Sequence, residues 1–101
     1  MANTAKALFR GAATTNTATT LYTVPSATTT IVTNIVVANT AASSATYTLS
    51  LNGVVIANAV AVGANDSAVL DIKQPIAATQ TIAGGASATT VNFHIAGIEI
   101  A

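Results

Sequence analysis

The side chains that could do chemistry are few in this 101-residue chain. It contains one histidine, three acidic residues, three basic residues and no cysteine. His94 lies on the outward-facing side of a predicted strand, flanked by Asn92 and Glu99. Zinc sites in proteins are built from several His, Cys or carboxylate ligands, which a lone histidine cannot provide. We therefore expect His94 to be an exposed or interface hydrogen-bonding residue, not a metal ligand or a general base.

Three other short segments resemble functional motifs, and each has a simpler structural interpretation. Asp71 and Lys73 are two apart on one strand face, where a solvated ion pair is expected. The segment 65–67, Asn-Asp-Ser, suggests a calcium turn or a glycosylation acceptor, but calcium requires six or more oxygens and this segment offers one carboxylate. We expect an ordinary turn there. No lysine and no helical pattern follow Gly84-Gly85, so this pair is not a phosphate-binding loop.

The serine and threonine residues are numerous, but no base partners them, so nucleophilic catalysis lacks support. The sequence predicts no enzyme, with no catalytic, cofactor-binding or metal-binding residues. It also predicts no small-molecule substrate.

The elements that must position these residues are strands, and the clearest is a hairpin around Asn52-Gly53. Asn-Gly between two apolar runs is the strongest short-range signal for a two-residue hairpin turn. A regular register pairs Leu51 with Val54, Leu49 with Ile56 and Tyr47 with Asn58. One face of this ribbon is then apolar, and the rest of the chain must cover it. That predicted face comprises Tyr47, Leu49, Leu51, Val54, Ile56, Val60 and Val62.

The remaining strands are predicted from short apolar runs between turn residues. Pro25, Pro75 and Gly84-Gly85 are expected to end three of them. The run 28–39 is apolar on both faces, which suggests a strand covered on both sides for part of its length. At Ala96-Gly97 we expect a bulge or bend, after which Ile98 and Ile100 take over the apolar face with Glu99 outside. The predicted strands span 21–24, 28–39, 46–51, 54–62, 67–73, 79–83 and 89–100.

This spacing predicts an all-β fold, an antiparallel β-sandwich or small barrel of seven or eight short strands. The short connections leave no room for the helices that parallel strands require. Residues 1–20 are expected to form an N-terminal arm or an edge strand, because Lys6, Leu8 and Arg10 alternate with smaller or apolar residues and 12–20 has no apolar period. Residues 21–101 form the sandwich domain in this prediction.

The composition favours a protein that works by lying against other proteins. Only 6% of the residues are charged, against roughly 25% in an ordinary soluble domain, and the net charge is zero. A near-zero net charge promotes association, so a homo-oligomer is expected. No basic patch points to nucleic acid or to a membrane. Neither a secretion signal nor a membrane-spanning apolar run is evident, and we expect a soluble protein made in a cytoplasm.

Three segments carry a resemblance to a known group of proteins. LYTVPSATTTIVTNIVVANT (21–40), ATYTLSLNGVVIA (45–57) and VNFHIAGIEI (91–100) are similar to segments of small virion structural proteins of tailed bacteriophages. The resemblance implies an immunoglobulin-like or related β-sandwich and a place in the virion. It also implies a capsid decoration (cement) protein that binds the major capsid protein and neighbouring copies of itself. A tail or baseplate component is the alternative within this group, and no functional residues are carried over.

A receptor- or carbohydrate-binding module is the alternative from another class. Such modules stack sugars on exposed aromatic rings, and this chain has only four aromatic residues. Tyr47 and Phe93 are expected to face the core, which leaves Tyr22 as the ring to test.

Overall fold

The computed structural model describes residues 3–101, and that range folds into eight antiparallel strands. Within the described range no residue is helical. The all-β prediction is therefore confirmed. The strands are β1 (Asn3–Ala12), β2 (Thr20–Thr23), β3 (Thr29–Asn39), β4 (Ala45–Leu51), β5 (Val54–Val62), β6 (Ser67–Ile76), β7 (Thr81–Ala86) and β8 (Val91–Ile100).

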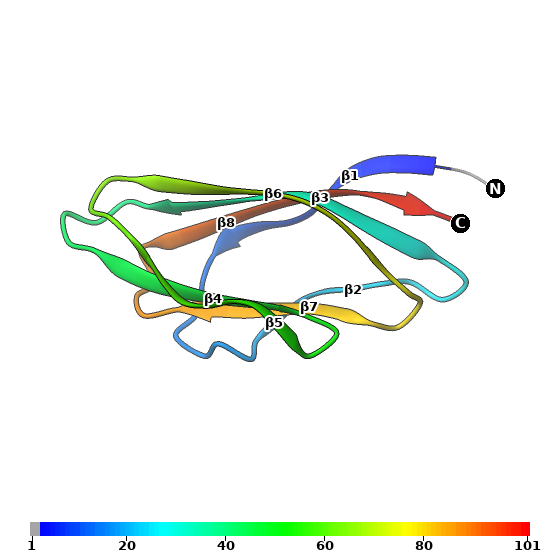
Figure 1. Ribbon diagram of the computed structural model, residues 1–101, viewed down its shortest axis with the longest axis horizontal. Helices are drawn as coiled ribbons and strands as arrows, with labels where there is room; N and C mark the ends of the chain where they lie inside the picture. The colour runs from blue at the N-terminus through cyan, green and yellow to red at the C-terminus, as the bar shows by residue number, and fades with distance from the viewer. Residues whose placement is uncertain (1–2) are drawn as a thin grey trace.

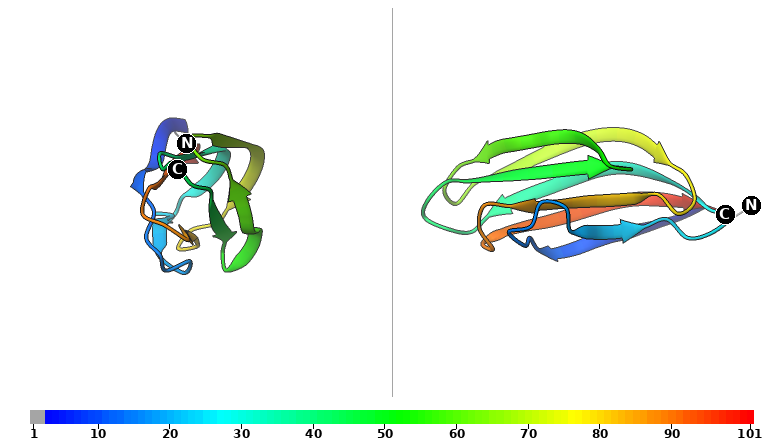
Figure 2. Two further views of the ribbon diagram at one scale, coloured as in Figure 1. Left: turned by 90° about the vertical axis from the view of Figure 1, so that its left-hand side faces the viewer. Right: turned by 90° about the horizontal axis from the view of Figure 1, so that it is seen from below.

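The strands form two four-stranded sheets that pack face to face (Figure 1). Sheet I has the order β1-β8-β3-β6 and sheet II the order β2-β7-β4-β5. The predicted sandwich is thus confirmed. Its principal extents are 45 × 21 × 18 Å, and the strands of both sheets run along the long direction (Figure 2).

The two sheets arise from one long hairpin that is wrapped around the core. Strands pair antiparallel as β4 with β5, β3 with β6, β2 with β7 and β1 with β8, so each pair encloses the one before it. Successive pairs alternate between the two sheets, and the cross-pairs β4–β7 and β3–β8 join them within each sheet. This wrapping is the jelly roll, a double-sheet relative of the immunoglobulin sandwich with a different strand order.

The tip of this long hairpin is the Asn52-Gly53 turn, as predicted. Both residues have positive φ, 51° and 76°, which is the conformation that a two-residue hairpin turn of this type requires. Leu51 pairs with Val54 across it. The remainder of the predicted register is wrong, because β5 contains two extra residues. Leu49 pairs with Ala57, and Tyr47 pairs with Val60.

The two bulges lie at Ile56 and near Ala59, and each has consequences for what β5 buries. Ala59 has a φ of 49°, and its backbone N–H donates a 3.0 Å hydrogen bond to the Thr48 hydroxyl. Val54, Ile56 and Val60 were predicted to be core residues, but all three are exposed, at 68%, 41% and 39%. Only Ala57 and Val62 of this strand are buried.

A line of bulges also crosses sheet I, opposite Ala96 and Gly97 of β8. The extra residues are Leu8 in β1 and Thr33 in β3, so the predicted irregularity lies in the partners of β8. The bulge at Thr33 moves the inward face of β3 from Val32 to Ile35 and explains why this strand is apolar on both sides.

β8 itself stays regular along its whole length. Its inward face continues from Val91 through Phe93, Ile95 and Gly97, all buried, to Glu99. The prediction that Glu99 points outward is therefore wrong. Since its neighbours absorb the irregularity, the alternation of β8 never switches.

The extended N-terminal arm is not confirmed, and the alternative of an edge strand describes residues 3–12. β1 pairs with β8 over ten residues. The following link stays on the same domain: Ala13 N–H donates to the Val91 carbonyl at 2.7 Å, and Ala86 N–H donates to the Thr14 carbonyl at 2.9 Å.

Two predicted strand ends are misplaced. Pro75 does not end β6, which continues to Ile76; β6 is an edge strand, where proline is tolerated because no neighbour needs its N–H. Gly84 and Gly85 lie inside β7 instead of after it. A Cβ on Gly84 would lie 2.6 Å from the Thr48 carbonyl oxygen, and one on Gly85 would lie 2.4 Å from that of Asn16. Glycine is there because other backbone segments approach closely.

The core fills the space between the sheets and contains the predicted inward residues of β4 and β8. Tyr47 and Phe93 are fully buried and meet edge to face with ring centroids 6.5 Å apart. At one end of the core, buried Asn39 organises the loops: its amide donates to the Ser43 and Gly63 carbonyls, and its carbonyl oxygen accepts from Ala41 N–H.

Leu49→Ala should lower the free energy of unfolding by about 2–5 kcal/mol, because Leu49 is fully buried and its loss leaves a cavity. The control is Val55→Ala on the neighbouring strand, where the side chain is 53% exposed and the change should stay within about 0.5 kcal/mol. Urea denaturation of both variants measures the difference. Equal effects would contradict the core assignment.

Gly84→Ala should destabilise the protein by about 1–3 kcal/mol, since the new methyl group would collide with the Thr48 carbonyl and the Leu49 side chain. Gly63→Ala is the matched control: its Cβ would meet only ordinary contacts at 3.6 Å, and its φ is not positive. Thermal melts of the two variants should therefore separate clearly. A Gly84→Ala protein that melts with the wild type would show that β7 and β4 are farther apart.

Candidate functional site

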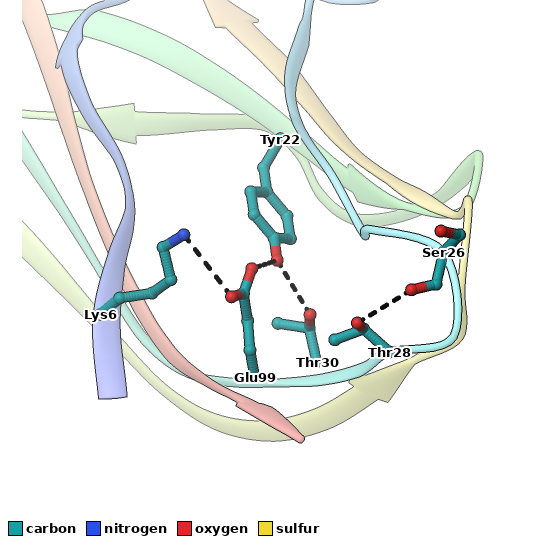
Figure 3. A network of polar contacts seen from close by, with 6 residues as sticks. All are labelled: Lys6, Tyr22, Ser26, Thr28, Thr30 and Glu99. Atoms are coloured by element: carbon teal, nitrogen blue, oxygen red, sulfur yellow. Dashed lines mark hydrogen bonds and ion pairs between the residues drawn. The ribbon is translucent and has the colours of Figure 1, made fainter. Parts of the chain in front are cut away.

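The largest cluster of polar side chains between the sheets connects four strands (Figure 3). The Tyr22 hydroxyl of β2 donates a hydrogen bond to the Glu99 carboxylate of β8. It also lies 2.9 Å from the Thr30 hydroxyl of β3. Lys6 Nζ of β1 lies 3.5 Å from the other Glu99 oxygen. Tyr22 of sheet II therefore contacts two strands of sheet I, β3 and β8, through polar groups, and Lys6 of β1 joins the network through Glu99.

The donor in each hydrogen bond of this network can be assigned, because an ionised carboxylate only accepts hydrogen bonds. The Tyr22 proton is donated to the carboxylate, so the Thr30 hydroxyl donates to the Tyr22 oxygen. Burial and the neighbouring Glu99 carboxylate raise the pKa of Tyr22, and the Thr30 donor partly offsets that rise. Burial alone raises the pKa of Tyr47. Each tyrosine is thus held in its neutral form.

This network connects the two sheets, because Tyr22 of sheet II donates to a carboxylate of sheet I that is also paired with Lys6. The sequence pattern did not predict this cluster, because Glu99 was expected to point outward. The regular alternation of inward positions along β8, 91-93-95-97-99, would have predicted it. The bulge or bend expected at Ala96-Gly97 instead led to the prediction that Glu99 points outward.

The residues singled out in the sequence are dispersed. His94 is exposed on the outer face of sheet I, where its cross-strand neighbours are Arg10 and Val36. Asp71 and Lys73 form the expected ion pair at 3.6 Å, with both side chains about four-fifths exposed at 80% and 79%. Such a pair contributes little to stability. In residues 3–101 no three His, Cys, Asp or Glu side chains come together as a metal site would require.

The segment 65–67 forms a turn between β5 and β6. Asn65 has a φ of 52°, and the Asp66 carboxylate accepts a 2.8 Å hydrogen bond from the backbone N–H of Ser67. The Asp66 carbonyl accepts from Asn39 N–H at 2.8 Å. The backbone contacts of this turn account for its polar residues.

An open groove separates the edge strands β5 and β6. It has a volume of about 260 Å³ and an apolar floor with three side-chain amides, Asn52, Gln74 and Gln80, around it. We call it the edge groove. It is lined by Leu51, Asn52, Val54, Ile56, Gln74, Pro75, Ile76 and Gln80.

The exposed large hydrophobic side chains of residues 3–101 all belong to the same two edge strands. Val54, Ile56 and Val60 share the inward side of β5, Val55 lies on its outer side, and Val69 belongs to β6. None of the lining residues of the edge groove carries a charge. Apolar side chains gathered in this way mark surfaces that meet another molecule. The edge groove is therefore the candidate functional site, and its chemistry suits a neutral, apolar protein surface.

The free energy of unfolding should fall above about pH 10, because both tyrosines have a pKa above the ordinary value of 10.0 in the folded protein. In that range the unfolded chain has lost tyrosine protons that the folded protein retains, and stability then decreases as pH rises. Tyr22→Phe should remove its share of this decrease and leave that of Tyr47. At neutral pH the same variant should cost about 1–3 kcal/mol, since Glu99 loses a donor.

Urea denaturation between about pH 7 and pH 11 measures both effects for wild type and Tyr22→Phe. Glu99→Gln provides the second arm of a double-mutant cycle, and the coupling between the two substitutions should be at least about 0.5 kcal/mol. Identical pH profiles for the two proteins would argue against a buried Tyr22 hydroxyl.

Within residues 3–101 no helix has the length and apolar character needed to cross a bilayer. A scan against models of protein families and a search of curated proteins both find no match to this chain.

Proposed function

We propose that this chain is a structural protein of a bacteriophage virion that decorates the head, where it binds the outer surface of the shell and stabilises it by protein–protein contacts. The observation that carries the proposal is that the exposed large hydrophobic residues of residues 3–101 lie on the edge strands β5 and β6, and that two of them, Val54 and Ile56, line a groove without charged residues. The proposal implies localisation in the virion and the major capsid protein as the partner.

The charge distribution supports binding to protein. Six formal charges are spread over an accessible surface of 5091 Å². Four of them are already engaged in the ion pairs Lys6–Glu99 and Asp71–Lys73. A surface with so little hydrated charge loses little solvation energy when another protein covers it. The same property disfavours nucleic acid and anionic lipid as partners, because both bind through basic patches.

The shape of β5 explains why side chains, not its backbone edge, would make the contact. An unprotected edge strand pairs readily with another strand, and proteins prevent this with charges, proline or bulges. β5 has no charge and no proline, but it has two bulges and a residue with positive φ at Ala59. A partner would therefore meet the side chains of Val54 and Ile56 in the edge groove.

The fold is compatible with this role by analogy only. Jelly rolls occur in viral capsid and lectin domains and in cupins, and a fold does not determine a function. The carbohydrate-binding alternative gains no support from the aromatic residues. Tyr47 and Phe93 are buried, and Phe9 and Tyr22 are partly buried, so none of the four rings is exposed as a stacking platform. A tail or baseplate position remains the alternative within the virion.

Electron cryomicroscopy of the phage whose genome encodes this chain tests the proposal. Particles with the gene should carry additional density of about the size of this molecule on the outer face of the head, and particles without it should lack that density. Heads without the protein should release DNA at a lower temperature, and adding purified protein should restore the wild-type value. Density on the tail would support the alternative position, and density on neither would overturn a virion role.

Ile56→Asp should weaken binding to heads that lack the protein by about tenfold or more, because an unpaired carboxylate would be buried in the contact. Val55→Asp is the matched control: the residue is adjacent and similarly exposed but points to the outer face of sheet II. A sedimentation assay with purified heads measures both affinities. If the two substitutions had the same effect, the edge groove would not be the contact.

A further inference from the structure

The outer face of sheet I combines small and branched apolar residues with polar and charged ones. Its outward residues form rows across the sheet, with register shifts at Leu8 of β1, at Thr33 of β3 and between Asp71 and Gln74 of β6. On the two central strands, Ile31 of β3 and Ile98 of β8 share one row, and Val36 of β3 belongs to another. From one end to the other the rows are Ala12-Asn92-Ala38-Ser67, Arg10-His94-Val36-Val69, Ala7-Ala96-Asn34-Asp71, Ala5-Ile98-Ile31-Pro75 and Asn3-Ile100-Thr29.

The outer face of sheet II has a different chemistry. Its outward positions on β4 are Thr46, Thr48 and Ser50, and their neighbours on β7 are small. The backbone of Thr14 and Asn16 lies against this face at Gly85, and Val55 of β5 is exposed on it. Hydroxyl side chains suit the part of a sheet face that meets water. Isoleucine and valine on the central strands β3 and β8 add nothing to the core of a single copy, because they point away from it. The difference between the two faces indicates that the outer face of sheet I is covered in the working protein.

We propose that a second copy of this chain covers that face, so that two sandwiches pack sheet I against sheet I around a two-fold axis parallel to the strands. This inference does not depend on the particle to which the chain belongs, and it uses a surface other than the edge groove. Face-to-face packing of sheets at about 10 Å is a standard arrangement, with the strands nearly aligned.

The charges on the face select this partner and this axis. Arg10 lies on edge strand β1, exposed and without an ion-pair partner among residues 3–101. Asp71 lies on the opposite edge strand β6, one row away, where its exposed carboxylate also lies 3.6 Å from Lys73 Nζ. A two-fold axis parallel to the strands places β1 of one copy over β6 of the other. Arg10 of each copy then lies near Asp71 of its partner, and the contact forms twice. An axis across the strands would place β1 over β1 and make neither pair.

The size of the face corresponds to a small specific interface. Four strands about 4.8 Å apart and about ten residues long present a face of roughly 600 Å² per copy. A standard interface buries about 800 Å² per partner, and weak ones bury less than about 600 Å² per partner. His94 lies on this face, beside Arg10.

Sedimentation velocity of the purified full chain over a range of concentrations tests the proposal. The wild type should sediment as a dimer, and Ile98→Asp should abolish the dimer. Arg10→Asp should raise the dissociation constant about tenfold, because it replaces two attractions with two repulsions. The charge swap Arg10→Asp with Asp71→Arg should return it to within about threefold of the wild-type value. Ile56→Asp in the edge groove should leave the dimer intact.

The other outcomes show which part of the proposal is wrong. A wild type that remains monomeric overturns the proposal, and so does a dimer that survives Ile98→Asp. If Ile56→Asp breaks the dimer, the edge groove is the self-contact. Circular dichroism checks that Ile98→Asp is folded; if it is not, the charge swap at two exposed positions still decides, since failure to restore association excludes the Arg10–Asp71 contact. Because Ile56→Asp is expected to weaken head binding and to leave the dimer intact, failure of this proposal is distinguishable from failure of the proposed head contact.

Discussion

The fold depends on one tight turn near the middle of the chain. Asn52 and Gly53 reverse the backbone with positive φ at both positions, and every other strand pair encloses the pair that this turn creates. Without the turn, β4 and β5 have no fixed register, and the outer pairs have nothing to wrap around. Because the nesting alternates between sheets, a single local reversal determines which strands become neighbours across 98 residues of sequence, from Asn3 to Ile100.

Much of the secondary structure could be predicted from the sequence, because turn residues and apolar alternation are local signals. The hairpin tip, the inward residues of β4 and the inward start of β8 follow from such signals alone. The register of β5 and the direction of Glu99 could not be predicted, because bulges depend on which strand carries the extra residue. At Gly97 the sequence indicates an irregularity but not that Leu8 and Thr33, far away in the chain, provide it.

The candidate site was harder to predict from the sequence than the fold. Val54 and Ile56 have the composition of core residues, and only the bulges of β5 make them exposed. Several residues with ionisable side chains instead stabilise the structure. Glu99, Lys6 and Tyr22 form the polar network that connects the sheets, and Asp66 belongs to a turn. What the composition did indicate is a surface poor in charge, and the structure locates its exposed large hydrophobic side chains on the edge strands β5 and β6.

The pairing of β1 with β8 also determines how the molecule responds to force. Asn3 and Ile100 lie opposite each other at one end of an antiparallel pair. Tension applied at these two points opens the ladder like a zipper, one hydrogen bond after another, and meets little resistance. Pressure perpendicular to the sheets is instead carried by the whole packed interior at once. The molecule is therefore mechanically anisotropic, stiff under compression and soft when its outermost strands are peeled apart.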